Sequence, residues 1–326
     1  VDPTLSFDDL ALIVATCQRH GIASFCPTLI TASQTDLLAG FSLLRRAREQ
    51  SPLLAAAMPC FHLEGPYLSS EDGPRGAHPR AHIRPPSEDE FAALQEAAGG
   101  SIRLVTLAPE WPGALDFIAR RVAEGVVVAI GHTAASPAQI REAVAAGARL
   151  STHLGNGSHA VLPRHDNYLW EQLADDRLTA SVIADGHHLP EAVLRVLLRT
   201  KQLGRLILTC DASSLAGLPP GRYAQWGTEL EVLPGGKVVV PGTPFLAGSG
   251  VLLDSCIRHL EQLGEWPLAD LLDAAGAQPR ALLGLPHREI AVGAPADLVL
   301  YRTAPFRIVQ VLLAGKPILS EGKRCD

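Results

Sequence analysis

The sequence predicts an α/β protein: a (β/α)₈ TIM barrel whose first strand is absent from these 326 residues, with a small β-sandwich appendage at the C-terminus. Two observations lead to this prediction. Short, apolar, β-branched segments alternate with helical patterns, which is typical of parallel strands joined by right-handed crossovers. Seven such strands are expected, one fewer than a closed barrel needs, and the chain begins with a helix. We therefore expect a shortened form of a longer product that folds poorly alone.

Capping residues and the spacing of hydrophobic residues predict where each helix and strand of the β/α units begins and ends. Ser6 is suited to cap the first helix, which Gly21 ends. Leu37, Phe41 and Leu44 recur at helical spacing and predict the second helix. The first strand is expected to end at Pro27. The expected helices are 6–20, 33–50, 87–98, 113–124, 137–146 and 191–200, and the expected strands are 22–26, a segment ending at 64, 102–107, 126–131, 149–153, 178–183 and 206–210.

The pattern changes after the seventh strand. Residues 229–240 read as a β-hairpin around a Gly-containing turn, and two helices are expected at 250–263 and 268–283. Short strands separated by Gly and Pro follow at 296–301, 308–313 and 316–318. We therefore assign residues 1–285 to the barrel and residues 286–326 to the C-terminal part of a small β-sandwich domain.

The composition excludes several classes of protein. With 47% apolar and 19% charged residues the chain is expected to be globular, and its net charge of −6 without a basic stripe argues against nucleic acid as a partner. No apolar run reaches the roughly 20 residues that span a bilayer, and the start lacks the features of a signal peptide. Reduced thiols in the cytoplasm are expected, because six cysteines are scattered without close pairing, namely Cys17, Cys26, Cys60, Cys210, Cys256 and Cys325.

Polar side chains occupy the ends of four expected strands, at Glu64, His132, His153 and Asp211. A TIM barrel carries its chemistry at the carboxyl ends of its strands. Imidazole and carboxylate groups bind a catalytic divalent ion such as zinc, and a further carboxylate is then needed to move protons. A lone histidine at a strand end is more often a hydrogen-bonded loop residue, but four coincident strand ends favour a metal site. Glu64, His132 and His153 are the predicted ligands, and Asp211 is the predicted proton carrier.

Several motifs in fixed order carry a resemblance that covers essentially the whole chain. Singly most of them are weak, but together they are highly specific. The chain resembles the N-acetylglucosamine-6-phosphate deacetylase family of the amidohydrolase superfamily. The motifs are Pro27-Thr28-Leu29-Ile30-Thr31, His62-Leu63-Glu64-Gly65-Pro66, Gly76-Ala77-His78-Pro79, Leu107-Ala108-Pro109-Glu110, Gly131-His132-Thr133, Thr152-His153-Leu154, Ile183-Ala184-Asp185-Gly186, Asp211-Ala212, Leu246-Ala247-Gly248-Ser249 and Gly293-Ala294-Pro295-Ala296-Asp297-Leu298.

The resemblance implies a metal-dependent enzyme of amino-sugar catabolism that hydrolyses the acetamide of N-acetylglucosamine 6-phosphate. It implies that Asp211 is the general base and acid, and that His78 polarises the acetyl carbonyl. Asn156, Gly157 and His188 correspond to residues that bind the sugar phosphate. The expected cofactor is one zinc ion, with iron, cobalt or manganese as alternatives and a second ion left open.

Arg164 is similar to the family's arginine that enters a neighbouring subunit's site, which implies a homodimer. The chain also departs from the family pattern. Where the family usually reads Asn-Ala-Met, this chain has Asn156-Gly157-Ser158, and the stretch at 164–167 differs as well. Both departures concern phosphate recognition. Two alternatives therefore stay open: an amidohydrolase acting on a different N-acyl or cyclic amide, and a catalytically inactive sugar-phosphate binder.

Overall fold

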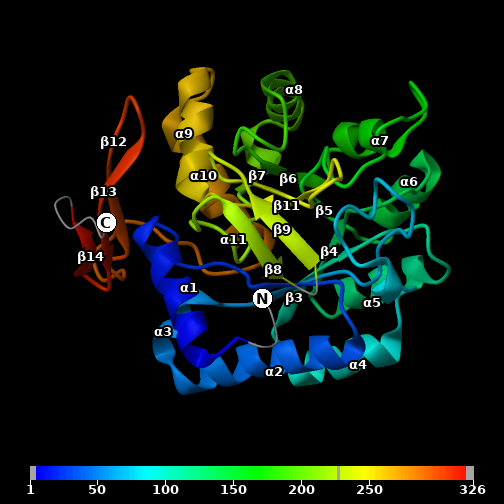
Figure 1. Cartoon of the computed structure of the whole chain (residues 1–326), viewed down its shortest axis with the longest axis horizontal. Helices are drawn as coiled ribbons and strands as arrows, with labels where there is room; N and C mark the ends of the chain where they lie inside the picture. Colours follow the sequence, from blue (N-terminus) through cyan, green and yellow to red (C-terminus); the bar gives the residue numbers. More distant parts are fainter. Residues whose placement is uncertain (1–4, 226–227, 321–326) are drawn as a thin grey trace.

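The computed structural model describes residues 5–225 and 228–320. Its centre is a curled, seven-stranded, entirely parallel sheet with the strands in sequence order (Figure 1). A parallel sheet of seven strands in sequence order was predicted and is present, although its first strand lies at other residues than expected. They are β1 (Thr28–Ile30), β2 (Phe61–Glu64), β3 (Ile102–Leu107), β4 (Val127–Ile130), β5 (Leu150–Ser151), β6 (Thr179–Ile183) and β7 (Leu206–Thr209).

The position of the first strand was predicted wrongly. Residues 22–26 are not a strand, and β1 begins only at Thr28, after Pro27, where Thr28 pairs with His62 of β2. Proline has no N–H to donate, so it is tolerated just before a strand and does not have to end one. The apolar run before Glu64 forms a short helix, α3, capped by the Ser51 hydroxyl.

Helices cover the outer face of the parallel sheet (Figure 1). Those between the first residues and β7 are α1 (Phe7–Arg19), α2 (Gln34–Gln50), α3 (Pro52–Ala57), α4 (Glu88–Ala97), α5 (Ala114–Ala123), α6 (Pro137–Ala145), α7 (Tyr168–Ala174) and α8 (Glu191–Lys201), with 3₁₀ turns η1 (Arg80–His82) and η2 (Leu203–Arg205). The sequence did not predict α7, which Asn167 caps by accepting from two backbone amides.

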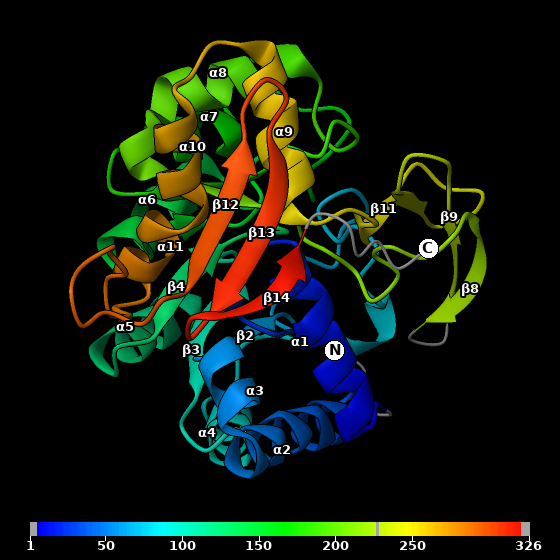
Figure 2. The same cartoon turned by 90° about the vertical axis from the view of Figure 1, so that its left-hand side faces the viewer.

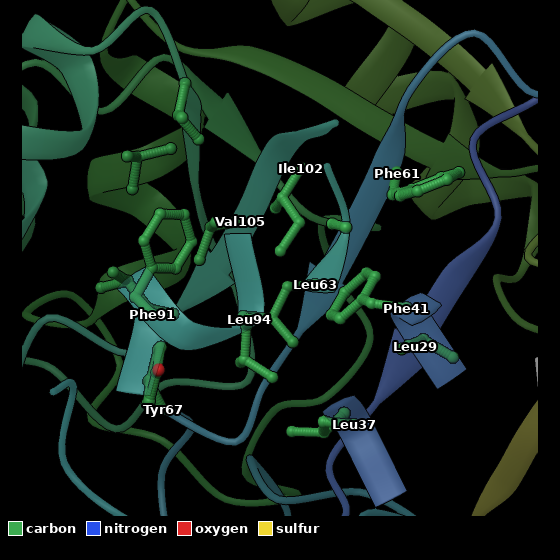
Figure 3. Packing of buried hydrophobic residues seen from close by; sticks show 14 of the residues in the cluster. Leu29, Leu37, Phe41, Phe61, Leu63, Tyr67, Phe91, Leu94, Ile102 and Val105 are labelled. Atoms are coloured by element: carbon green, nitrogen blue, oxygen red, sulfur yellow. The ribbon is translucent and has the colours of Figure 1, made fainter. Parts of the chain in front are cut away.

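The packing under these helices decides which side chains face inward. Phe61 and Leu63 of β2 lie among the buried side chains of α2 and α4 (Figure 3), and the rings of Phe61 and Phe41 are 6.1 Å apart. Because side chains alternate along a strand, His62 and Glu64 must point to the opposite, inner face. Burial of the odd-numbered residues of β2 therefore directs Glu64 into the barrel interior.

An antiparallel sheet is inserted between β7 and α9. It consists of β8 (Gly221–Gln225), β9 (Thr228–Val232), β10 (Lys237–Val239) and β11 (Leu246–Ser249), and it extends to one side of the parallel sheet (Figure 2). The predicted hairpin corresponds to β9 and β10, whereas β8 and β11 were not predicted. The Gly248 backbone approaches the chain after β7 closely, since a Cβ there would lie 2.8 Å from the carbonyl oxygen of Asp211.

The last part of the described chain contains three helices and a three-stranded antiparallel sheet. The predicted helix at 268–283 is in fact two helices, separated at Gly276. The elements are α9 (Leu253–Leu263), α10 (Leu268–Ala275), α11 (Ala277–Leu282), β12 (Leu298–Arg302), β13 (Arg307–Leu313) and β14 (Lys316–Ser320). Phe306 is buried in the same cluster as Ile257 and Leu260 of α9, so this sheet packs against the rest of the molecule.

No helix in the described ranges is both long and apolar enough to cross a membrane. Five cysteines in these ranges are free thiols, namely Cys17, Cys26, Cys60, Cys210 and Cys256. Cys325 lies outside the described residues.

Candidate active site

Glu64, His132 and His153 meet at the carboxyl ends of the parallel strands. The Nε2 atoms of His132 and His153 lie 3.2 Å and 3.1 Å from Oε1 of Glu64, and 3.0 Å from each other. All three residues are buried, with exposed fractions of 5–7%. The structure thus brings together the three side chains that the sequence singled out as metal ligands.

These donor atoms fit a single divalent ion. His132 approaches the carbonyl oxygen of Pro74 with Nδ1 at 2.8 Å, so Nδ1 carries the proton and Nε2 presents a lone pair. That lone pair faces both a carboxylate oxygen and Nε2 of a second imidazole, an arrangement that a cation between the three atoms would stabilise. Ligands at 2.0–2.2 Å from a tetrahedral zinc ion lie roughly 3.4 Å apart, close to the separations found here.

The backbone at the strand ends is bent sharply to aim these side chains. His132, His153 and Asp211 have φ angles of 50°, 29° and 51°, in the left-handed region that residues other than glycine seldom adopt. Such conformations persist only where surrounding contacts hold them, and they cluster at functional sites. At His132 these contacts include the amide of Ser69, which donates to its carbonyl oxygen at 2.9 Å.

His78 reaches the same site from the loop after β2. Its ring packs edge-on against His132 with centroids 4.4 Å apart, and its Nδ1 lies 2.9 Å from the hydroxyl oxygen of Thr31. Burial, together with the neighbouring His132, holds the pKa of His78 well below its usual range, which keeps the ring neutral. Potential ligand atoms of Glu64, His78 and His132 also lie within 4.8 Å of one another. We favour His153 as the third ligand, because its Nε2 lies within 3.1 Å of both other donors.

Asp211 follows β7 and lines the same cavity as the three predicted ligands. Burial raises the pKa of its carboxyl group, and the negative charge of Glu64 raises it further. Glu64 is affected differently. Burial raises its pKa, but hydrogen bonds with His132 and His153 outweigh this effect, so the pKa lies well below its usual range. The pKa values of two carboxylates in one cavity are therefore shifted in opposite directions, a pattern typical of acid–base sites.

Comparison with known proteins identifies the family. The chain is 37% identical to the N-acetylglucosamine-6-phosphate deacetylase of Bos taurus over 307 residues, which cover 89% of this chain and 72% of the bovine protein. It is 33% identical to an N-acetylgalactosamine-6-phosphate deacetylase of Escherichia coli O157:H7, over 82% of this chain and 69% of that protein. No family model matches.

Among solved structures, the chain is similar to the deacetylase of Mycobacterium smegmatis in complex with N-acetyl-D-glucosamine 6-phosphate. The TM-score is 0.87 at 34% identity, over 97% of this chain and 81% of the other. The chain belongs to the N-acetylglucosamine-6-phosphate deacetylase family.

The structure places only some of the family's expected substrate-binding residues at the site. Asn156, Gly157 and His188 line the cavity of about 1550 Å³ that contains the predicted ligands. Gly157 is packed tightly there, since a Cβ would lie 2.7 Å from Nδ1 of His132. Arg164 does not line this cavity; it lies in an exposed loop, and its carbonyl oxygen accepts from the Trp170 indole at 3.0 Å.

Sequence reasoning did not assign roles to several polar residues around this deacetylase site. Glu110 accepts from the hydroxyl of Thr133 at 2.6 Å and from the amide of Ala134 at 2.8 Å, directly after His132. The carboxylate of Asp185 likewise accepts from the hydroxyl of Ser249 and lies within hydrogen-bond distance of Nδ1 of His188. The motifs containing Glu110, Asp185 and Ser249 were recognised, but the sequence does not reveal which side chains they contact.

Proposed function

We propose that this chain is a metal-dependent amide hydrolase that converts N-acetylglucosamine 6-phosphate to glucosamine 6-phosphate and acetate. The observation that carries the proposal is the convergence of Glu64, His132 and His153 within 3.0–3.2 Å of one another, in a cavity that Asp211 also lines. The same arrangement argues against a catalytically inactive binder, because such a protein needs neither a proton carrier nor a cation site.

Each side chain has a distinct role in the proposed reaction. Glu64, His132 and His153 would hold one divalent ion, which when bound activates water and polarises a carbonyl oxygen. Asp211 takes the proton from the attacking water and returns it to the sugar nitrogen as the C–N bond breaks. A raised pKa suits Asp211 for this task, because the group must both accept and release a proton.

His78 stabilises the negative charge that develops on the acetyl oxygen. With Nδ1 accepting from the Thr31 hydroxyl, Nε2 carries the proton and can donate to that oxygen. The lowered pKa of His78 favours this neutral donor form. We assign zinc as the ion because the proposed donor set, two imidazoles and one carboxylate, is typical of catalytic zinc sites, with iron, cobalt and manganese as alternatives. Elemental analysis of the metal-loaded protein measures how many ions are bound.

The parallel sheet supports a further part of the proposal. Within the described residues β1 pairs only with β2 and β7 only with β6, and both edges line the large cavity. We propose that, in the complete barrel, an eighth parallel strand fills the part of this cavity between β1 and β7 and leaves the part at the carboxyl ends of the strands open for substrate. We also propose residues 1–285 as the barrel domain and 286–326 as part of the appended β-domain. A homodimer, with Arg164 reaching a neighbouring copy, and a cytoplasmic location remain predictions.

The test is acetate release by the metal-loaded protein from four substrates. We expect turnover of N-acetylglucosamine 6-phosphate and far slower turnover of unphosphorylated N-acetylglucosamine. N-acetylgalactosamine 6-phosphate is included because an N-acetylgalactosamine-6-phosphate deacetylase is among the relatives. Preferential turnover of this sugar would change the proposed substrate but not the reaction. An N-acyl amino acid represents other amidohydrolases, and its preferential hydrolysis, or no acetate release at all, would overturn the proposal.

A further inference from the structure

The carboxylate of Asp185 is buried next to His188, and both of its oxygens accept hydrogen bonds from the protein. Its Oδ2 accepts from Nδ1 of His188 and from the hydroxyl of Ser249, both at 2.8 Å. Its Oδ1 accepts from the backbone amides of His187 at 2.8 Å and His188 at 3.0 Å. Only 1% of the side chain is exposed. Asp185 is therefore not a group that meets substrate or metal directly.

The partner of this carboxylate, His188, does reach the cavity. Its side chain is 6% exposed and lines the cavity that contains the predicted ligands. Because a carboxylate oxygen can only accept, the contact places the proton on Nδ1 and turns Nε2 away from Asp185. The tautomer and the orientation of the His188 ring are thus both set by Asp185.

Ser249 connects this pair to the predicted general base. Its backbone amide donates to the carbonyl oxygen of Asp211 at 2.8 Å, and its own carbonyl accepts from the amide of Ser213 at 2.9 Å. Ser249 is fully buried and is the last residue of β11. One residue of the inserted sheet therefore contacts both the Asp211 segment and the carboxylate that holds His188.

The inserted sheet contacts this region a second time. Nε2 of His187 lies 2.8 Å from the carbonyl oxygen of Gly235, in the turn between β9 and β10. The loop after β6 is thus held by Ser249 at one point and by Gly235 at another. The insertion is well placed to fix the distance between His188 and Asp211.

We propose that Asp185 and Ser249 are positioning residues, which hold the imidazole of His188 against the phosphate of a sugar phosphomonoester while the reacting amide lies at Asp211. This inference rests on the proposed function, because it takes the substrate to be a phosphorylated N-acetyl amino sugar. It goes further in assigning the geometry of phosphate recognition to a contact between the loop after β6 and the inserted sheet.

The test compares Asp185→Asn, Ser249→Ala and the matched control Asp270→Asn, an exposed carboxylate on α10. For Asp185→Asn we expect KM for N-acetylglucosamine 6-phosphate to rise about 10-fold or more, with kcat changed by less than about 3-fold. Values of kcat/KM for unphosphorylated N-acetylglucosamine should stay unchanged. Ser249→Ala keeps its backbone contacts and should give a smaller effect in the same direction. An equal loss of kcat/KM on both substrates would overturn the proposal.

A double variant separates positioning from misfolding. If Asp185 acts through His188, then Asp185→Asn should have little effect in a protein that already carries His188→Asn. Additive losses in KM would overturn the proposal. Calorimetric binding of glucosamine 6-phosphate to the metal-loaded variants gives the same comparison without turnover. If the unmodified protein releases no acetate, the proposed function fails, whereas the binding measurement still decides the role of Asp185.

Discussion

Nε2 of His153 lies 3.1 Å from Oε1 of Glu64, although the two residues are 89 positions apart in the chain. The contact forms because Glu64 ends β2 and His153 follows β5, and both strands have their carboxyl ends at the same edge of the curled sheet. It joins the two halves of the predicted metal site. Replacing either side chain by one that cannot bind a metal should therefore act mainly through loss of the ion.

Glu64→Gln is expected to lower metal content. The amide is neutral and a much weaker ligand, and it leaves His132 and His153 with their lone pairs unshared. We expect affinity for zinc to fall by about 100-fold or more. Elemental analysis after dialysis against a mild chelator measures this directly. His165→Asn, in an exposed loop, is the matched control. Full metal occupancy in Glu64→Gln would remove Glu64 from the ligand set.

Asp211→Asn should separate metal binding from turnover. The asparagine has nearly the same shape but cannot accept a proton, so kcat for acetate release should fall by at least about 100-fold. Metal content should match that of the unmodified protein, because Asp211 is not one of the three proposed ligands. Elemental analysis and an acetate assay on the same sample decide this. Loss of the ion in this variant would show that Asp211 is itself a ligand.

Glu110→Gln tests the support of His132. Glu110 accepts from Thr133 at 2.6 Å and from Ala134 at 2.8 Å, and these contacts hold the bent backbone that follows His132. A glutamine retains only one accepting oxygen, so His132 should be held less firmly and zinc affinity should fall by about 10-fold. Competition with a chromogenic chelator gives the affinity. Glu142→Gln, an exposed carboxylate on α6, should change nothing. Unchanged affinity in Glu110→Gln would contradict this role.

The strand ends were predictable because their signals are local. Gly65 and Pro66 stop β2 at Glu64, and a buried apolar run precedes Asp211, so each side chain could be assigned to a strand end from its neighbours in sequence. The alternation of strand and helix then indicated one common edge. This was enough to group Glu64, His132, His153 and Asp211 before their distances were known.

Contacts between distant segments were not predictable in the same way. The pairing of Asp185 with Ser249 depends on how the inserted sheet folds back, and strands β8 and β11 have too little apolar alternation to reveal that path. The start of β1 was predicted wrongly because the residues before Pro27 have the composition of a strand. They precede Thr28, which is the first residue that pairs with β2. Pairing partners, rather than composition, set that boundary.

Lys201, which lies outside the candidate active site, should make the free energy of unfolding depend on pH. Its ammonium group donates to the carbonyl oxygens of Asp175 at 2.7 Å and Leu178 at 3.0 Å, and the residue is fully buried. Burial is the main reason that its pKa is lowered to about 8, although the carboxylates of Asp175 and Asp176 partly oppose the shift. The unfolded chain keeps its proton up to the ordinary pKa of 10.5.

This difference fixes the sign of a pH effect on stability. Between the two pKa values the unfolded state binds more protons than the folded state, so the contribution of Lys201 to the free energy of unfolding rises with pH. Below about pH 8 both states are protonated and the contribution is constant. We expect the free energy of unfolding of the unmodified protein, relative to Lys201→Met, to increase by up to roughly 3 kcal/mol as the pH rises from about 7 to about 10. Urea unfolding of both proteins across this range measures the difference, which cancels the titration of all other groups. A difference that stays flat, or falls as the pH rises, would mean that Lys201 titrates in the folded protein as it does in water.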